Sequence, residues 1–139
     1  IQAAVLNVKF RYLPQWTNRR REIALIYENG LSGVKGIKLP PATNADLRFF
    51  DVFQNYVLRA QRRDELFKFL SEKGVETLIK DPVANHLHKG LGLSHFHLPF
   101  TEQLAKEVIS LPMYPELTNE QVEFVIGTIR KFYRGTRSP

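Results

Sequence analysis

The sequence predicts an α+β domain, and three observations point to that class. Residues 52–80 read as a strand, a helix and a second strand. Helical patterns flank this unit at residues 1–31, 100–109 and 118–134. A hydrophobic content of 43% and a charged content of 24% are ordinary for a globular protein of 139 residues, so we expect one domain, residues 1–139.

The central strand–helix–strand unit is predicted from a change in hydrophobic period. Residues 52–58 place apolar or aromatic side chains on both alternating faces, as in a strand that is covered on both sides. Asp64 is expected to cap the next helix, because its carboxylate can accept from free N–H groups of the first turn. Lys73 and Gly74 are expected to end that helix, and residues 75–79 to form the second strand. If the two strands are parallel, their connection crosses over right-handed.

The first helical pattern is expected to be interrupted at Pro14. Proline lacks a backbone donor and clashes with the preceding turn, so the helix should kink or restart near Leu13. Residues 1–10 place apolar side chains on more than one face, which exceeds a single amphipathic stripe. The chain begins Ile-Gln-Ala-Ala without a helix cap, and we expect it to be a piece of a longer protein.

The net charge of +6 and the pI near 9.7 raise the question of nucleic-acid binding. Basic residues are scattered apart from residues 19–21 and 59–63, and acids follow both clusters, so we predict no nucleic-acid partner. Residues 19–21 are interpreted as a solvated helix face paired with Glu22. No apolar run is long enough to span a bilayer, and no cysteine is present, so we expect a cytoplasmic protein without disulfides or a membrane partner.

A polar, proline-bearing loop at residues 80–90 follows the predicted second strand, and we expect any chemistry there. All four histidines lie in or just after this loop, as the pairs His86/His88 and His95/His97. On an extended strand each pair would offer two imidazoles to one metal ion; alternatively, they are loop histidines that bond the backbone or titrate freely. Their spacing matches no zinc signature, so no metal site is predicted.

The remaining elements are expected to be structural. Residues 37–39 read as a short strand and residues 40–44 as a surface loop. Thr101 is expected to cap the helix at residues 100–109. Residues 118–121 form a capping box before an apolar stripe at i, i+3, i+4 and i+7. The sequence contains no phosphate-binding glycine loop, nucleophile elbow or paired-carboxylate constellation.

Short motifs run in one order along nearly the whole chain. Ser-Leu-Pro-Met-Tyr-Pro-Glu-Leu-Thr at residues 110–118 is similar to a closing signature, and Arg-Arg-Arg-Glu-Ile-Ala at 19–24 with Tyr27 is similar to an "RRxIAxxY" stretch. Pro-Phe-Thr-Glu at 99–102 is similar to a "PxxE" motif, and segments within residues 56–77 follow in the same order. Together these motifs resemble the DegT/DnrJ/EryC1/StrS family of nucleotide-sugar aminotransferases, which use pyridoxal phosphate.

The resemblance is to the carboxyl-terminal small domain of that family, a fold-type-I pyridoxal-phosphate transferase. It implies a short, mostly antiparallel sheet packed against helices, with a long N-terminal helix. It also implies that pyridoxal 5'-phosphate is held by a large domain whose lysine forms the Schiff base, and that this chain lacks that domain. We therefore expect no cofactor bound to this chain alone, and no activity from it.

For the intact enzyme, the resemblance implies transfer of an amino group from glutamate to a nucleotide-linked keto-deoxysugar. This domain would close one wall of the substrate cleft, and the enzyme would be a homo-oligomer. No residue of this chain is expected to be catalytic or to bind the cofactor.

The resemblance also supplies candidate substrate-binding residues: His86, Lys80, Gln54, Asn85 and Arg59. Gln54 and Lys80 stand where the family has histidines, whereas His86 retains one. Arg59 either neutralises a carboxylate or phosphate or is a surface charge at a strand end. The departures at Gln54 and Lys80 support a second hypothesis: a non-catalytic, degenerate aminotransferase-like module for assembly or binding.

Overall fold

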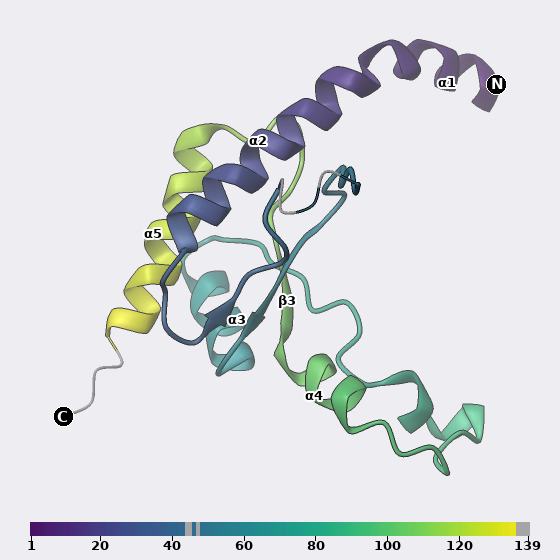
Figure 1. Cartoon of the computed structure of the whole chain (residues 1–139), viewed down its shortest axis with the longest axis vertical. Helices are drawn as coiled ribbons and strands as arrows, with labels where there is room; N and C mark the ends of the chain where they lie inside the picture. Colours follow the sequence, from purple (N-terminus) through teal and green to yellow (C-terminus); the bar gives the residue numbers. More distant parts are fainter. Residues whose placement is uncertain (44–45, 47, 136–139) are drawn as a thin grey trace.

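A bent helical arm leads into the body of the molecule (Figure 1). In the computed structural model, which describes residues 1–43, 46 and 48–135, helix α1 (Gln2–Lys9) is followed by a 3₁₀ turn, η1 (Phe10–Tyr12), and by helix α2 (Leu13–Leu31). Pro14 lies in the first turn of α2, where an N–H would have no helical partner. The predicted interruption, with a restart at Leu13, is therefore confirmed. The predicted loop at 40–44 ends at Asn44, which lies outside the described residues.

The sheet of the described residues has three antiparallel strands in the order β1–β2–β3. They are β1 (Ile37–Lys38), β2 (Tyr56–Ala60) and β3 (Val108–Leu111). In β2 the side chains of Tyr56, Leu58 and Ala60 are buried, whereas Val57 is 39% exposed. The prediction that this strand is covered on both faces is therefore wrong for the described part of the chain.

The central strand also begins later than predicted. Phe53 has a left-handed backbone (φ 48°), and its N–H donates to the Asp51 carboxylate at 2.7 Å, which makes a turn. The second strand predicted at residues 75–79 is reduced to one antiparallel bridge, between Leu78 and Ser110 of β3. No parallel crossover is therefore formed in the described structure, because this segment runs along the free edge of β3.

The helix boundaries differ from the sequence predictions at two starts. Helix α3 (Arg63–Glu72) begins after Arg62, which has a left-handed backbone (φ 57°), so Asp64 lies in the first turn rather than at the cap. Helix α4 (Pro99–Glu107) begins after Leu98, so Thr101 is not its cap, and residues 108–109 belong to β3. The residue expected to be the cap is therefore the second residue of α3 and the third residue of α4.

Two other predicted helix boundaries are confirmed. Gly74, with φ 76°, follows the end of α3 as expected. Helix α5 (Asn119–Arg134) starts with the predicted capping box, in which Gln121 N–H donates to Thr118 Oγ1 and Thr118 N–H donates to the Gln121 side chain. The short 3₁₀ turns η2 (Asn85–Leu87) and η3 (Lys89–Leu91) lie in the long segment between α3 and α4.

The core lies between the sheet and the adjacent helices α2 and α5 (Figure 1). The ring centroids of Tyr27 on α2 and Tyr56 on β2 are 5.0 Å apart. The Tyr27 hydroxyl donates to Pro112 O at 3.0 Å. Burial raises the pKa of Tyr27 well above its ordinary value, so the hydroxyl stays a neutral donor. The predicted stripe of α5 faces this core: Val122, Val125, Ile126, Ile129 and Phe132.

The arginines at residues 19–21 bind backbone carbonyls of distant segments instead of forming a solvated face. Arg20 Nη1 donates to Phe53 O, Gln54 O and Met113 O at 3.2, 2.9 and 3.0 Å. These carbonyls follow or precede strands, where the chain makes no regular sheet bonds of its own. The solvated-face interpretation is therefore wrong for Arg20, which ties two connecting segments to α2.

The neighbours of Arg20 act in the same way. Arg19 donates to Leu117 O at 2.7 Å as well as to Glu22 at 3.1 Å, so the predicted pair with Glu22 is present but is one contact among several. Arg21 donates to Asp51 O at 2.6 Å, and its guanidinium lies 4.3 Å from the Phe50 ring centroid.

We predict that Arg20→Met destabilises the chain by about 2–3 kcal/mol, because three carbonyls lose a charged donor. Chemical unfolding in urea measures this change. Arg11→Met, at an exposed position of η1, is the matched control and should change the free energy of unfolding by less than about 0.5 kcal/mol. Equal effects of the two substitutions would contradict the carbonyl clamp.

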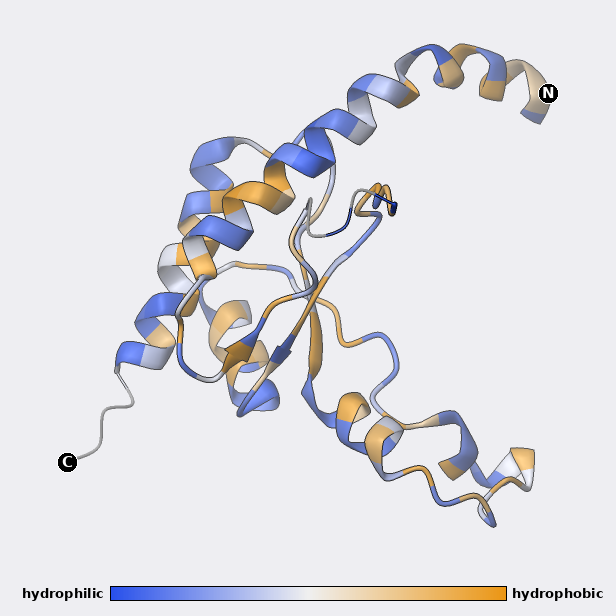
Figure 2. Ribbon diagram, viewed as in Figure 1, coloured by the Kyte–Doolittle hydropathy of each residue, from blue (hydrophilic) through white to orange (hydrophobic). Residues whose placement is uncertain are grey.

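Helix α1 has no buried residue, and Figure 2 shows hydrophobic residues between hydrophilic ones along it. Val5, Leu6, Val8 and Phe10 are each about half exposed, at 48–59%. The expected exposed apolar surface at the amino end is therefore present in the described structure. None of the described helices is both long enough and apolar enough to cross a membrane.

We predict that this surface makes the chain self-associate, since monomers rarely expose large apolar patches. Light scattering over a dilution series should show a mass above that of the monomer, and Leu6→Glu with Phe10→Glu should restore the monomer. Glutamates placed instead at Lys68 and Lys106, which are exposed outside α1, should leave association unchanged. A monomer at high concentration would contradict the prediction.

Candidate functional site

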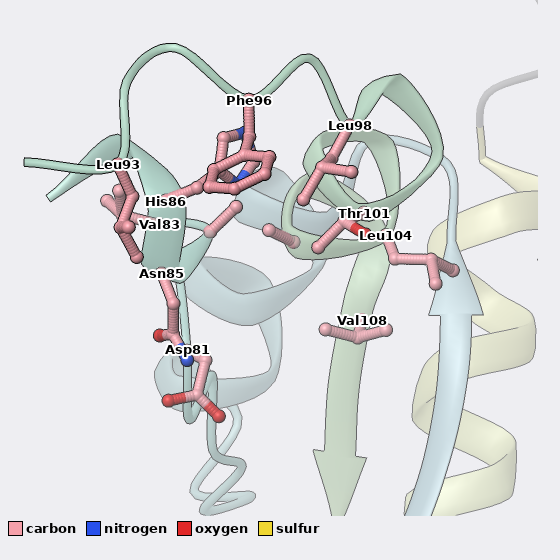
Figure 3. A pocket seen from close by; sticks show the side chains of 12 residues that line it. Asp81, Val83, Asn85, His86, Leu93, Phe96, Leu98, Thr101, Leu104 and Val108 are labelled. Carbon is pink, nitrogen blue, oxygen red and sulfur yellow. The ribbon is translucent and has the colours of Figure 1, made fainter.

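A cleft of about 680 Å³ lies between the 81–98 segment and helix α4 (Figure 3). Its lining is mostly apolar: Val83, Ala84, Leu93, Phe96, Leu98, Leu104, Ala105 and Val108. The polar residues of the lining are Asp81, Asn85, His86 and Thr101. In Figure 3, Asp81 and Asn85 lie at one end, away from Leu98 and Thr101. The volume and the few polar groups are typical of a small-molecule site.

His86 is the buried polar group of this cleft. Its side chain is 4% exposed, and its Nε2 lies 3.0 Å from Glu102 Oε1 on α4. The hydrogen bond from His86 holds the pKa of the Glu102 carboxyl below its ordinary value, so the carboxylate is ionised and Nε2–H donates to it. The pair ties turn η2 to helix α4 and so joins the two sides of the cleft.

Buried Arg63 positions the other end of α4. Its Nη1 donates to Ala105 O at 3.1 Å and Val108 O at 3.2 Å, and its Nε donates to the exposed Asp64 carboxylate at 2.7 Å. These bonds satisfy carbonyls where α4 passes into β3. Helix α4 is therefore held at its first turns by Glu102 and at its last turn by Arg63.

Two of the five predicted substrate-binding residues, His86 and Asn85, line the cleft. Lys80 is exposed and directly precedes Asp81 of the lining. Gln54 lies in a different groove, of about 430 Å³, beside Trp16 of α2. The structure thus groups the 80–86 candidates and separates Gln54 from them.

Arg59 already has a carboxylate partner within the chain. Its Nε donates to Glu107 Oε2 at 2.7 Å, and its guanidinium lies 5.9 Å from the Phe100 ring centroid. The side chain is 26% exposed, so it is not a free charge at a strand end. The hydrogen bond from Arg59 lowers the pKa of the Glu107 carboxyl, and a second hydrogen bond, from Gln103, acts in the same direction. Arg59 ties β2 to α4.

Sequence reasoning missed Glu102 as a site residue. The signal was present, because Glu102 closes the "PxxE" motif at residues 99–102, but its partner lies sixteen positions away in an irregular segment. Phe96 was missed because no periodicity marks residues 88–98, which contain only the short turn η3 as regular structure.

The His86/His88 pair does not have the extended arrangement that would offer two imidazoles to one metal ion. His86 lies in a 3₁₀ turn and is buried, whereas His88 is exposed, so they do not share a face. Among the described residues no group of three or more histidines and carboxylates is placed to hold a metal ion.

Pyridoxal phosphate would require a lysine of this chain that can form a Schiff base. Such a lysine must be desolvated or placed beside another cation to be a nucleophile at neutral pH. All lysines lie within the described residues, and every one is exposed. The residues of this chain do not fit the cofactor, and no chemical step through it is assigned to them.

The chain belongs to the DegT/DnrJ/EryC1/StrS aminotransferase family, whose family model matches residues 1–130. A pleiotropic regulatory protein of Geobacillus stearothermophilus is 42% identical over 96% of this chain and 37% of its own length. The dTDP-3-amino-3,4,6-trideoxy-alpha-D-glucose transaminase of Streptomyces venezuelae is 37% identical over 95% of this chain and 35% of its own length.

Solved structures agree with this assignment. DesV of Streptomyces venezuelae, crystallised with a ketimine intermediate, superposes with a TM-score of 0.86 at 34% identity, over 99% of this chain and 37% of DesV. The aminotransferase TlmJ of Streptoalloteichus hindustanus superposes with a TM-score of 0.85 at 32% identity, over 95% of this chain and 36% of TlmJ. The chain thus spans little more than a third of these relatives. Its α+β fold, with a short antiparallel sheet and a long N-terminal helix, confirms the fold that the resemblance implied.

We predict a pH-dependent contribution of Glu102 to stability. Because its pKa is lowered in the folded state, its contribution is complete above the ordinary value of 4.5 and is lost as pH falls through the folded value. Urea unfolding of wild type and Glu102→Gln should therefore give a difference that shrinks as pH is lowered below 4.5. Glu123→Gln, at an exposed position of α5, is the control and should give no such trend. Parallel stability curves for wild type and Glu102→Gln would contradict the assigned pair.

Proposed function

We propose that this chain is the carboxyl-terminal small domain of a pyridoxal-phosphate-dependent aminotransferase acting on a nucleotide-linked keto-deoxysugar, with glutamate as amino donor. The observation that carries the proposal is the family match over residues 1–130. Relatives named as transaminases of dTDP-linked amino-deoxysugars, at 33–37% identity, indicate the substrate class. Pyridoxal phosphate belongs in this proposal to the intact enzyme, where it supplies the electron sink for amino transfer.

In this proposal the cleft beside α4 forms one wall of the sugar site. A deoxysugar has an apolar methyl edge as well as hydroxyl groups, and the apolar lining of the cleft suits that edge. Asn85 is exposed at the cleft and can both donate to and accept from a hydroxyl. With Nε2–H donated to Glu102, the Nδ1 atom of a neutral His86 ring can accept from a hydroxyl.

The other three candidates have different parts in the proposal. Lys80, exposed next to the cleft, would place a positive charge near the phosphates of the nucleotide. Arg59 would act through Glu107, by holding α4 against β2. Gln54 would contact the substrate only if the bound nucleotide extends to the groove beside Trp16.

The test is an amino-transfer assay with the product of the intact gene that encodes these residues. With glutamate and a dTDP-linked 3-keto-6-deoxyhexose, mass spectrometry should detect the amino sugar and 2-oxoglutarate in equal amounts. Asn85→Ala should lower kcat/KM about tenfold, the size expected for one lost hydrogen bond to a substrate.

The control for this assay is Lys68→Ala, at an exposed position of α3 outside the cleft. It should leave kcat/KM unchanged. A folded protein that transfers no amino group to any nucleotide-linked keto sugar would overturn the proposal.

A second candidate function is a non-catalytic binding or assembly module. Two relatives bear regulatory names: the pleiotropic regulatory protein of Geobacillus stearothermophilus, and the "erythromycin biosynthesis sensory transduction protein EryC1" of Saccharopolyspora erythraea, 41% identical over 94% of this chain and 36% of its own length. The same assay separates the two, because such a module would bind the sugar nucleotide without releasing 2-oxoglutarate.

A further inference from the structure

Another groove, of about 670 Å³, lies at the carboxyl ends of α2 and α5, and we call it the basic groove. The residues of its lining used below are Lys35, Gln61, Arg62, Arg130, Tyr133 and Arg134. In Figure 1 the carboxyl end of α5 and helix α4 lie on opposite sides of the body. The basic groove is therefore separate from the cleft of the proposed sugar site.

The floor of the basic groove is built by close packing and hydrogen bonds. Gly36, with φ 93°, lets Tyr133 approach so closely that an added Cβ would lie 2.7 Å from its Cε1. Gln61 N–H donates to Gly36 O at 2.8 Å, and the Tyr133 hydroxyl donates to Gln61 O at 2.6 Å. These contacts fix the turn after α2, the turn after β2 and the end of α5 relative to one another, so the shape of the groove exists before any ligand arrives.

The lining carries four cations, from three separate parts of the chain. Arg62 is held in place, because its guanidinium pairs with Glu65 and lies 4.9 Å from the Phe132 ring centroid. The side chains of Lys35, Arg130 and Arg134 make no hydrogen bond or ion pair with any described residue. Three cations that have no acidic partner among the described residues thus line one preformed hollow.

Helix-end electrostatics account for only part of this cluster. A basic residue in the last turn, such as Arg134, complements the partial negative charge at a helix carboxyl end. Lys35 and Arg62 lie in turns outside α5, and Arg130 lies one turn before Arg134. The half-charges of two helix ends are smaller than the net charge of four lining cations, of which Arg62 alone has an acidic partner, Glu65, among the described residues.

The spacing of the two α5 arginines indicates the ligand. Residues at i and i+4 are neighbours on a helix, about 6 Å apart at Cβ, so Arg130 and Arg134 can each address one of two adjacent phosphates. Guanidinium forks bind phosphate oxygens in bidentate fashion. We propose that the basic groove binds a diphosphate group, carried by inorganic pyrophosphate or by a nucleoside diphosphate. This site does not depend on the proposed transferase function.

The test is isothermal titration of the full 139-residue chain with inorganic pyrophosphate and, separately, with dTDP. Wild type should give saturable binding at one site per chain, and Arg130→Gln with Arg134→Gln should weaken it at least tenfold. Lys68→Gln with Lys106→Gln removes the same charge from exposed positions outside the groove and should change the affinity less than twofold. Circular dichroism checks that all variants are folded.

A further variant separates charge from geometry. Arg130→Lys with Arg134→Lys keeps the charge without the forks and should bind more weakly than wild type but more tightly than the glutamine variant. Tighter binding of pyrophosphate than dTDP assigns the free anion, and the reverse assigns the nucleotide. Non-saturable binding, an equal loss in both glutamine pairs, or stronger competition by duplex DNA than by either diphosphate would overturn the proposal.

Discussion

The fold depends on the arginines of α2, which bind carbonyl oxygens that no strand or helix satisfies. Arg20 joins the segment before β2 to the segment after β3. Arg19 binds Leu117 O in the second of these segments, and Arg21 binds Asp51 O in the first. An unpaired buried carbonyl costs free energy comparable to a lost hydrogen bond, so these contacts determine where the two irregular segments can lie. The three-stranded sheet is then placed against α2 and α5, with the Tyr27–Tyr56 contact at its centre.

This arrangement explains how a small sheet carries two separate candidate sites. On one side, Arg59 of β2 and Arg63 of α3 anchor α4, and the His86–Glu102 pair closes the adjacent loop onto that helix. On the other side, the ends of α2 and α5 meet the turn after β2 and form the basic groove. The cleft beside α4 is mainly apolar, which suits the methyl edge of a deoxysugar. The basic groove is cationic, which suits a diphosphate.

Local sequence signals predicted the elements whose stabilising contacts are local. The capping box at Thr118, the stripe of α5, the glycine after α3 and the restart at Pro14 are all confirmed. The second strand at residues 75–79 failed because its apolar residues pair with β3 only at Leu78, and no sequence pattern states which edge of a sheet is available. The arginines were misread because their partners are carbonyls 22 to 98 positions away.

The sequence predicted part of the candidate site and missed the residues that only tertiary packing brings to it. His86 and Asn85 were found because the family resemblance marks them, whereas Glu102 became a partner of His86 only through the packing of α4. Gln54 comes from the same resemblance but lies in another groove, directly after the left-handed turn at Phe53. Candidates that come from one family resemblance therefore lie in two different grooves.

Hydrogen exchange measured by mass spectrometry on wild type and Arg20→Met tests most directly whether the α2 arginines organise the fold. Exchange should accelerate in residues 51–55 and 112–118, which Arg19 to Arg21 hold, and stay unchanged in turn η2 beside the cleft. Unchanged exchange in both connecting segments, or a uniform increase over the whole chain, would contradict this account.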